Sequence, residues 1–209
     1  MTRVVAVRHG ETEWNRTERL QGWAPVPLNE RGREQAAAAG EWLADAYSFD
    51  RVFVSDLTRT IETADIVLEA ADGTPTSSAP VSHEPDWRER NLGVYQGLTY
   101  GEVDDRFPDY GLSERARRNP HTVPEGGESY ADMADRVTRR FSEIVDDYRG
   151  ETMLVVTHGG PLHLLLGHAK GMSIPEALTE HSQNNCAVNE FEVSDGRIDV
   201  VRENATDWL

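Results

Sequence analysis

The 209-residue sequence contains a single cysteine, Cys186, and a single lysine, Lys170. One cysteine excludes an intrachain disulfide, and this usage is typical of a reducing compartment, so we expect a cytoplasmic protein. No apolar run approaches the roughly 20 residues that a membrane-spanning helix needs. The apolar start of the chain is soon interrupted by Arg8 and His9, which argues against a signal peptide. These absences predict no membrane partner.

Basic residues are outnumbered, with 37 acidic against 21 basic residues and a formal net charge of −16. A protein that binds duplex nucleic acid needs a basic face, so this charge argues against a nucleic-acid partner. Strong negative charge keeps a protein soluble and is a property that halophiles use. We therefore hypothesise a halophilic protein from a high-salt cytoplasm, with an ordinary acidic enzyme as the alternative.

The chain also lacks internal repeats, low-complexity tracts and long linkers, so we expect a single domain over residues 1–209. Short aliphatic runs predict buried strands, and longer amphipathic or alanine-rich segments between them predict helices. The expected strands are 4–7, 51–55 and 152–157, and the expected helices are 28–47, 57–70, 128–148 and 161–169. Two final strands, 186–193 and 197–203, flank an Asp-Gly hairpin signal.

This alternation predicts an α/β fold, a three-layer sandwich with a mainly parallel central sheet, helices on both faces and a C-terminal hairpin. A chain of this length buries a sizeable core without disulfides. The segment 88–127 has an irregular pattern. We interpret it as a cap or insertion over the active site.

Cationic and hydroxyl side chains follow three of the expected strands. Arg8 and His9 end the first strand, Ser55 ends the second with Arg59 shortly after it, and His158 follows the third. The carboxyl ends of parallel strands meet at one edge of a sheet, where ligands bind in open α/β folds. Crowded cationic groups are stable there when a multiply charged anion lies between them, and arginine suits phosphate oxygens. The sequence therefore predicts a phosphate site.

Five segments, in order, resemble the histidine phosphatase superfamily, which includes cofactor-dependent phosphoglycerate mutases and broad-specificity phosphatases. The segments are RHGETEWN, QGWAPVPLNERG, SDLTRTIETA, RERNLGVYQG and VTHGG. They extend over nearly the whole chain. The resemblance implies a phosphoglycerate mutase-like fold and catalysis through a phosphohistidine.

The resemblance also implies roles for individual residues. His9 would be the nucleophile, which divides one difficult displacement into two easier steps. Arg8, Arg59 and His158 would hold the phosphoryl oxygens and stabilise the charge on them in transit. Glu89 would protonate the leaving oxygen and then activate water.

These roles impose opposed demands on protonation. His9 must be neutral to attack, whereas Glu89 must hold a proton although Arg88 and Arg90 flank it in the sequence. We therefore expect a bell-shaped dependence of the rate on pH, which reports coupled groups.

The resemblance further implies substrate contacts. Asn15 would contact the phosphate, although capping of a turn is its alternative role. The backbone near Gln21 and Gly22 would line the entrance, and Arg90 matches a mutase position that contacts a substrate carboxylate. Backbone N–H groups around Gly159, at the start of a helix, would add donors for the anion.

A phosphatase and a mutase of this family differ in whether water or a second phosphoglycerate hydroxyl accepts the phosphoryl group. RERNLGVYQG is close to the mutase version of that segment, but Tyr100 stands near a position where mutases offer lysine. We favour a histidine acid phosphatase-type phosphomonoesterase that acts on small phosphorylated metabolites without a cofactor. The alternatives are a phosphoglycerate mutase that depends on 2,3-bisphosphoglycerate and a non-catalytic, phosphate-binding regulatory module.

Other residues receive no catalytic role, and we expect no metal site. His163 and His168 follow His158 at intervals of five, whereas zinc ligands on one helix prefer an interval of four, so we interpret both as packing residues. Arg117 and Arg118 would contact a carboxylate or form a solvated face. The sequence predicts no particular oligomeric state.

Overall fold

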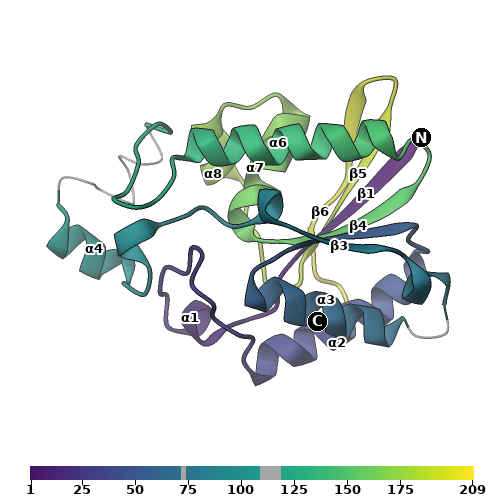
Figure 1. Ribbon diagram of the computed structural model, residues 1–209, viewed down its shortest axis with the longest axis horizontal. Helices are drawn as coiled ribbons and strands as arrows, with labels where there is room; N and C mark the ends of the chain where they lie inside the picture. Colours follow the sequence, from purple (N-terminus) through teal and green to yellow (C-terminus); the bar gives the residue numbers. More distant parts are fainter. Residues whose placement is uncertain (72–73, 109–118) are drawn as a thin grey trace.

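The computed structural model describes residues 1–71, 74–108 and 119–209. Within these residues, six strands form one sheet in the order β3-β2-β4-β1-β5-β6 (Figure 1). The strands are β1 (Thr2–Arg8), β2 (Arg51–Ser55), β3 (Val81–Glu84), β4 (Thr152–Thr157), β5 (Val188–Ser194) and β6 (Arg197–Ala205). The first four run parallel, whereas β5 and β6 form an antiparallel hairpin beside β1. The expected mainly parallel sheet with a C-terminal hairpin is confirmed.

Helices cover both faces of this sheet, which confirms the expected sandwich (Figure 1). One face carries α2 (Glu30–Ala46) and α3 (Thr58–Ala70), and the other carries α6 (Tyr130–Asp147), α7 (Gly159–Lys170) and α8 (Ile174–Glu180). Two short helices, α1 (Glu13–Arg16) and α4 (Tyr100–Arg106), lie beyond the carboxyl ends of the strands. None of the helices in the described ranges is long and apolar enough to cross a bilayer.

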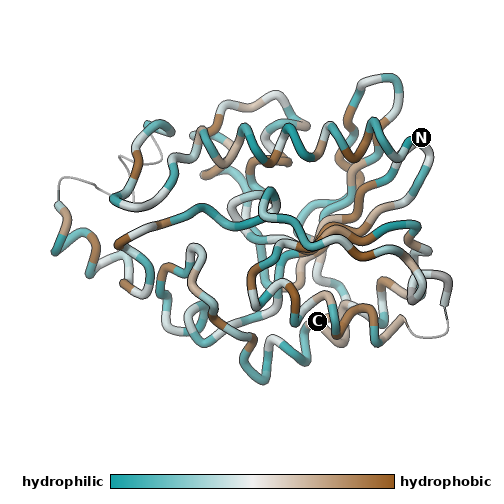
Figure 2. The backbone as a smooth tube through the Cα atoms, viewed as in Figure 1, coloured by the Kyte–Doolittle hydropathy of each residue, from teal (hydrophilic) through white to brown (hydrophobic). Residues whose placement is uncertain are grey.

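Successive residues of the central strands point to opposite faces, which explains their unbroken aliphatic runs. Val4 and Ala6 join the apolar cluster under α6 and α7. Val5 and Val7 join the cluster under α2 and α3. The hydropathy colouring of Figure 2 accordingly shows apolar residues gathered on the central strands.

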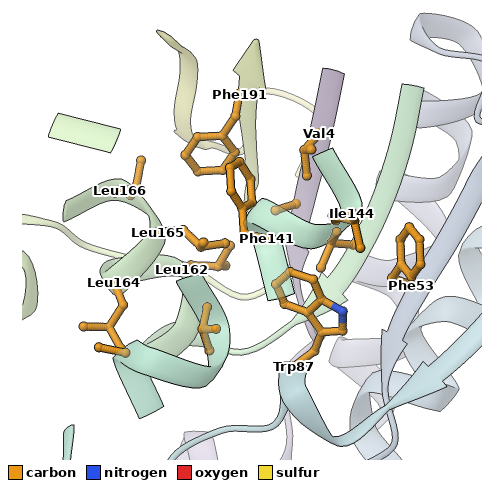
Figure 3. Close-up of a cluster of buried hydrophobic side chains, with 14 of the residues drawn as sticks. Val4, Phe53, Trp87, Phe141, Ile144, Leu162, Leu164, Leu165, Leu166 and Phe191 are labelled. Atoms are coloured by element: carbon orange, nitrogen blue, oxygen red, sulfur yellow. The ribbon is translucent and has the colours of Figure 1, made fainter. Parts of the chain in front are cut away.

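Trp87 anchors the chain that enters the site. It ends the 3₁₀ helix η2 (Pro85–Trp87) and is fully buried in the cluster of Figure 3. Its ring Nε1 donates to Glu84 at 3.0 Å, and its carbonyl oxygen accepts a hydrogen bond from the Thr157 hydroxyl at 2.7 Å. The segment that follows Trp87 is thereby tied to the carboxyl end of β4.

The helix termini follow local sequence signals. Asn29 is the expected N-cap of α2, and its side chain accepts a main-chain N–H at 2.8 Å. Ser129 and Asp132 form the expected capping box of α6. The helix expected over 161–169 begins earlier, at Gly159, because proline is well tolerated in a first turn and does not have to be the first helical residue.

The segment 88–127 contains a short 3₁₀ helix, η3 (Gly93–Tyr95), and α4 within its described part. Leu92, Tyr95 and Val103 form a small apolar cluster with Leu20, separate from the two main clusters. The interpretation of the segment 88–127 as a cap over the active site stays a prediction. Arg117 and Arg118 lie outside the described residues.

Candidate active site

The sheet register places His9 beside His158. Arg8 is the partner of Thr157 in the parallel β1–β4 ladder, and the main-chain N–H of His9 donates to the Thr157 carbonyl at 3.0 Å. The two imidazole rings lie edge to face with their centroids 5.2 Å apart. Two strand ends that are distant in sequence therefore bring two histidines to one edge of the sheet.

A hydrogen bond defines the proton position on His9. Its Nδ1 lies 2.7 Å from the carbonyl oxygen of Gly10, which is only an acceptor, so we assign the proton to Nδ1 and a free lone pair to Nε2. Burial, and then the guanidinium groups of Arg59 and Arg8, lower the pKa of His9 well below its ordinary value of 6.5. His9 thus holds the neutral form that a nucleophile requires.

His158 follows β4 and is the N-cap residue of α7. Its Nε2 lies 2.8 Å from the hydroxyl oxygen of Ser55, the last residue of β2. Burial, and then the charge of Arg59, lower the pKa of His158 well below 6.5. We assign the proton of the neutral ring to Nδ1, with Nε2 accepting from the serine hydroxyl; Nδ1 is a buried atom with no hydrogen-bond partner among the described residues.

Arg8 and Arg59 have no carboxylate partner in the described ranges. Arg59 is 1% exposed and donates to the carbonyl oxygens of Gly22 at 2.8 Å and Ala24 at 3.2 Å. Arg8 donates from Nη1 to the carbonyl oxygen of Gln183. Burial lowers the pKa of Arg8 and lowers that of Arg59 to about 10, so both remain cationic at neutral pH.

Three buried side-chain nitrogens of these residues have no hydrogen-bond partner in the described part of the chain. They are Nε of Arg8, Nε of Arg59 and Nδ1 of His158, which is a donor in the tautomer assigned above. Leaving one buried polar group unsatisfied costs about 1–3 kcal/mol, and more when the group is charged. A tetrahedral oxyanion such as phosphate carries enough acceptor oxygens to satisfy several donors at once. The site has the electrostatics of an anion-binding site.

Two main-chain N–H groups, one of them at the start of α7, donate to the carboxylate of Glu89. Its Oε1 accepts the N–H of Arg90 at 2.8 Å, and its Oε2 accepts the N–H of Gly160 at 3.1 Å. Its carbonyl oxygen accepts hydrogen bonds from Trp23 Nε1 at 2.7 Å and Arg136 Nη2 at 3.0 Å. The carboxylate is thereby fixed in the pocket without a direct ion pair among these contacts.

Arg88, which flanks Glu89 in the sequence, forms an ion pair with Asp56 in the structure. The guanidinium group of Arg88 forms two 2.6 Å hydrogen bonds with the carboxylate of Asp56. It also lies 4.5 Å from the centre of the Trp23 ring. Sequence adjacency suggested a free positive charge beside Glu89, but Asp56 balances that charge.

A pocket of about 530 Å³ lies at this edge of the sheet. Every site residue named from the sequence, except His158, contributes to its lining: Arg8, His9, Asn15, Gln21, Gly22, Arg59, Glu89, Arg90 and Gly159. His158 is fully buried and reaches the site through its contact with the His9 ring. In the described ranges, no group of three or more His, Cys, Asp or Glu side chains is arranged to hold a metal ion.

Two residues expected to contact substrate also hold the pocket wall together. The Asn15 side-chain oxygen accepts the N–H of Thr12 at 3.1 Å, which confirms a capping role for Asn15. Arg90 is 2% exposed, donates to the carbonyl oxygen of Glu128 at 2.9 Å and lies 4.0 Å from the Tyr130 ring centre. Contacts of Asn15 and Arg90 with a substrate stay predictions.

Sequence reasoning missed much of the pocket wall. Trp14, Tyr130, His163 and Gln183 all line the pocket. His168 is exposed on α7, so its interpretation as a packing residue is wrong. His163 is half-buried and lines the pocket, so its interpretation as a packing residue stays a prediction. The capping signal before Tyr130 indicates the start of a helix but not that Tyr130 lines a pocket. Gln183 lies in a stretch with no periodic pattern, so no sequence signal indicates it.

The chain is similar to proteins of one known family. The sequence model of the histidine phosphatase superfamily (branch 1) matches residues 4–206. The chain is 37% identical to phosphoglycerate mutase-like protein 4 of Arabidopsis thaliana over 92% of this chain and 80% of that protein. It is 34% identical to the metal-independent phosphoserine phosphatase of the same plant, over 93% of this chain and 78% of that protein.

A solved structure shows the same architecture. Bacillus stearothermophilus YhfR superposes with a TM-score of 0.88 and 30% identity, covering 99% of this chain and 98% of that one. The family match extends over the residues that carry both histidines, both arginines and Glu89. The chain therefore belongs to the histidine phosphatase superfamily.

Proposed function

We propose that this protein is a phosphomonoesterase that hydrolyses small phosphorylated metabolites through a phosphohistidine on His9. The carrying observation is the His9 ring, whose Nδ1 contact with the Gly10 carbonyl leaves Nε2 free, in a site with buried side-chain nitrogens that have no partner in the described part of the chain. A nitrogen nucleophile and a set of oxyanion donors are the two parts that phosphoryl transfer requires. The family and the names of its relatives indicate a phosphatase or a mutase, which supports the same chemistry.

In the first half-reaction, Nε2 of His9 attacks phosphorus and the bond from phosphorus to the ester oxygen breaks. Glu89 in its protonated form gives its proton to that oxygen, which leaves as an alcohol. Arg8, Arg59 and His158 hold the phosphoryl oxygens through the buried donors described above. Because these donors are fixed before substrate arrives, little reorganisation is needed as charge shifts in the transition state.

In the second half-reaction, water attacks the phosphohistidine. Glu89 is now a carboxylate and accepts a proton from the water as the new phosphorus–oxygen bond forms. The phosphorus–nitrogen bond breaks, inorganic phosphate leaves and His9 returns to its neutral state. An acid in one step is the natural base in the reverse type of step. The cycle converts one phosphate ester and one water into an alcohol and inorganic phosphate, and it needs no cofactor.

The second candidate is a phosphoglycerate mutase, in which a second phosphoglycerate hydroxyl replaces water. The observation that favours it is the buried Arg90 in the pocket wall, which is suited to a substrate carboxylate. A mutase would also need 2,3-bisphosphoglycerate to phosphorylate His9.

One incubation separates the candidates. The enzyme is mixed with 3-phosphoglycerate, with and without 2,3-bisphosphoglycerate, while inorganic phosphate and 2-phosphoglycerate are both measured. A panel of phosphorylated sugars, phosphoserine and p-nitrophenyl phosphate runs in parallel. Phosphate release without isomerisation supports the phosphatase. Isomerisation that depends on the bisphosphate supports the mutase, and no product from any compound supports a phosphate-binding module.

The covalent step has its own test. The wild-type protein should acquire an acid-labile, alkali-stable phosphate label from a phosphorylated substrate, and His9→Gln should acquire none. The matched control is His168→Gln, because His168 is exposed on α7 outside the pocket. A label of undiminished stoichiometry on His9→Gln would place the covalent bond on another residue.

A further inference from the structure

The loop between α8 and β5, residues 181–187, holds Arg8 from several directions. The carbonyl oxygen of Gln183 accepts a hydrogen bond from Nη1 of the Arg8 side chain. The N–H of Cys186 donates to the Arg8 carbonyl at 3.1 Å, and the Ala187 carbonyl accepts the Arg8 N–H at 3.2 Å. The main-chain contacts place the end of β1, and the Gln183 contact sets the direction of the guanidinium group.

Gln183 is in turn fixed by a reciprocal pair of amide hydrogen bonds with Asn189 of β5. Nε2 of Gln183 donates to Oδ1 of Asn189 at 3.2 Å, and Nδ2 of Asn189 donates to Oε1 of Gln183 at 2.9 Å. Gln183 is 8% exposed and Asn189 is fully buried. A reciprocal pair of this kind satisfies both side-chain amides, and separating the two side chains would leave buried polar atoms unsatisfied.

Asn204 of β6 extends this pair into a cluster. Its main-chain N–H donates to Oδ1 of Asn189 at 3.0 Å. Its side chain accepts the N–H of Asn184 at 2.7 Å and donates to the Ser182 hydroxyl at 3.0 Å.

The backbone at Asn204 is specialised for these contacts. Its φ of 49° lies in the left-handed region, which asparagine tolerates better than most residues. The β5–β6 ladder also shifts its register in this part of the hairpin. Such bulges re-aim side chains and are frequent beside active sites.

We propose that Gln183, Asn189 and Asn204 are positioning residues that aim the guanidinium group of Arg8 at the phosphoryl group. Arg8 has a long side chain and no carboxylate partner in the described ranges, so the Gln183 carbonyl provides its directional contact. Because the guanidinium group of Arg8 is fixed before substrate binds, binding does not incur the entropic cost of ordering that side chain. The inference rests on the proposed function, in which Arg8 holds phosphoryl oxygens.

The test measures binding of orthovanadate, an analogue of the transferring phosphoryl group, by calorimetry on the purified chain. Gln183→Met keeps the size of the side chain but removes the amide pair, and we expect its Kd to rise about tenfold. Asn204→Gly suits the left-handed backbone and removes only the side-chain contacts to the loop, so we expect a rise of about threefold. The control is Asn184→Ala, an exposed amide in the same loop that keeps its main-chain contact, with less than a twofold change.

A double-mutant cycle separates positioning from general destabilisation. Arg8→Lys keeps a positive charge but cannot form the same two-pronged contact with phosphate. If Gln183 acts through Arg8, Gln183→Met should change the Kd less than twofold in the Arg8→Lys background. A tenfold rise in both backgrounds, or no rise in either, overturns the inference. Asn204→Gly enters the same cycle, so a folding failure of Gln183→Met does not remove the test.

Failure of this inference is distinguishable from failure of the proposed function. If the wild-type protein neither binds orthovanadate nor hydrolyses p-nitrophenyl phosphate, the proposed function falls and the inference falls with it. If the wild-type protein does both and the amide variants match Asn184→Ala, the inference alone is wrong.

Discussion

The hydroxyl oxygen of Ser55 lies 2.8 Å from Nε2 of His158, although 103 residues separate the two positions in the chain. Ser55 ends β2 and His158 follows β4, and these strands are neighbours in the sheet. In the assignment above, the Ser55 hydroxyl donates to Nε2 of His158, and the contact therefore keeps the ring proton on Nδ1. Ser55 does not line the pocket, so any effect it has on the site acts through the tautomer assigned to His158.

Replacing Ser55 with alanine tests this relationship. Nε2 of His158 would lose its donor, so the ring proton would no longer be restricted to Nδ1. We expect kcat/KM on p-nitrophenyl phosphate to fall about tenfold to a hundredfold, less than the roughly 10²–10³-fold loss when an oxyanion donor is removed, because the Nδ1 proton is no longer fixed rather than absent. The free energy of unfolding should fall by about 1–3 kcal/mol because a buried acceptor is left unsatisfied. An activity equal to that of Ser142→Ala, on the exposed face of α6, would contradict the tautomer assignment.

Glu89→Gln should separate the two half-reactions. The amide keeps the shape of the side chain but cannot transfer a proton. p-Nitrophenol leaves readily without protonation, so we expect a stoichiometric burst of product followed by turnover about 10²–10⁴-fold slower than in the wild type. Stopped-flow absorbance measures both phases. Steady turnover at the wild-type rate, as expected for the exposed control Glu34→Gln, would remove Glu89 from catalysis.

Gly160→Ala should displace the Glu89 carboxylate. A Cβ atom at residue 160 would lie 2.1 Å from Oε1 of Glu89, which is closer than the two atoms can approach. We expect activity to fall about tenfold or more because a small misplacement of a catalytic group is costly. Gly101→Ala in α4 is the control, since its Cβ would meet no atom within 4 Å. Equal activity of the two variants would show that the Glu89 position is not critical.

Stability should fall as the pH decreases from 7.5 to 5.5. The pKa values of His9 and His158 are lowered in the folded protein, so below about pH 6.5 the unfolded chain binds more protons than the folded chain does. Each ring should cost about 1 kcal/mol of stability between pH 6.5 and 5.5 and almost nothing above pH 7.5. Urea unfolding in phosphate-free buffer measures this dependence. The double variant His9→Gln, His158→Gln should show a flatter curve, and a parallel curve would contradict the pKa directions.

The formal net charge of −16 predicts a stabilising effect of salt. Screening weakens the mutual repulsion of the excess carboxylates, which otherwise opposes the compact state. We expect the unfolding temperature to rise by about 5–10 °C between dilute buffer and 2 M KCl. A shift of this size corresponds to a gain of a few kcal/mol in the free energy of unfolding. Maximal stability in dilute buffer would contradict the hypothesis of a halophilic protein.

The layered fold and the sheet edge that carries the candidate site are both predictable from the amino-acid sequence. Runs such as 4–7 and 152–157 identify buried strands because they are local and uninterrupted, and parallel strands bring their carboxyl ends to one edge. For that reason Arg8, His9, Arg59 and His158 were recognisable without coordinates. Glu89 was recognisable only through its resemblance to a family segment.

The pairing and protonation of these groups depend on contacts that form in the folded protein. The lone pair on His9, the N–H on His158 and the pairing of Arg88 with Asp56 each depend on one contact between side chains or carbonyls. The irregular segments contribute pocket residues such as Gln183 that no periodic pattern indicates. Periodicity in a sequence reports which face of an element is buried. Hydrogen-bond direction and charge pairing arise only when distant segments meet.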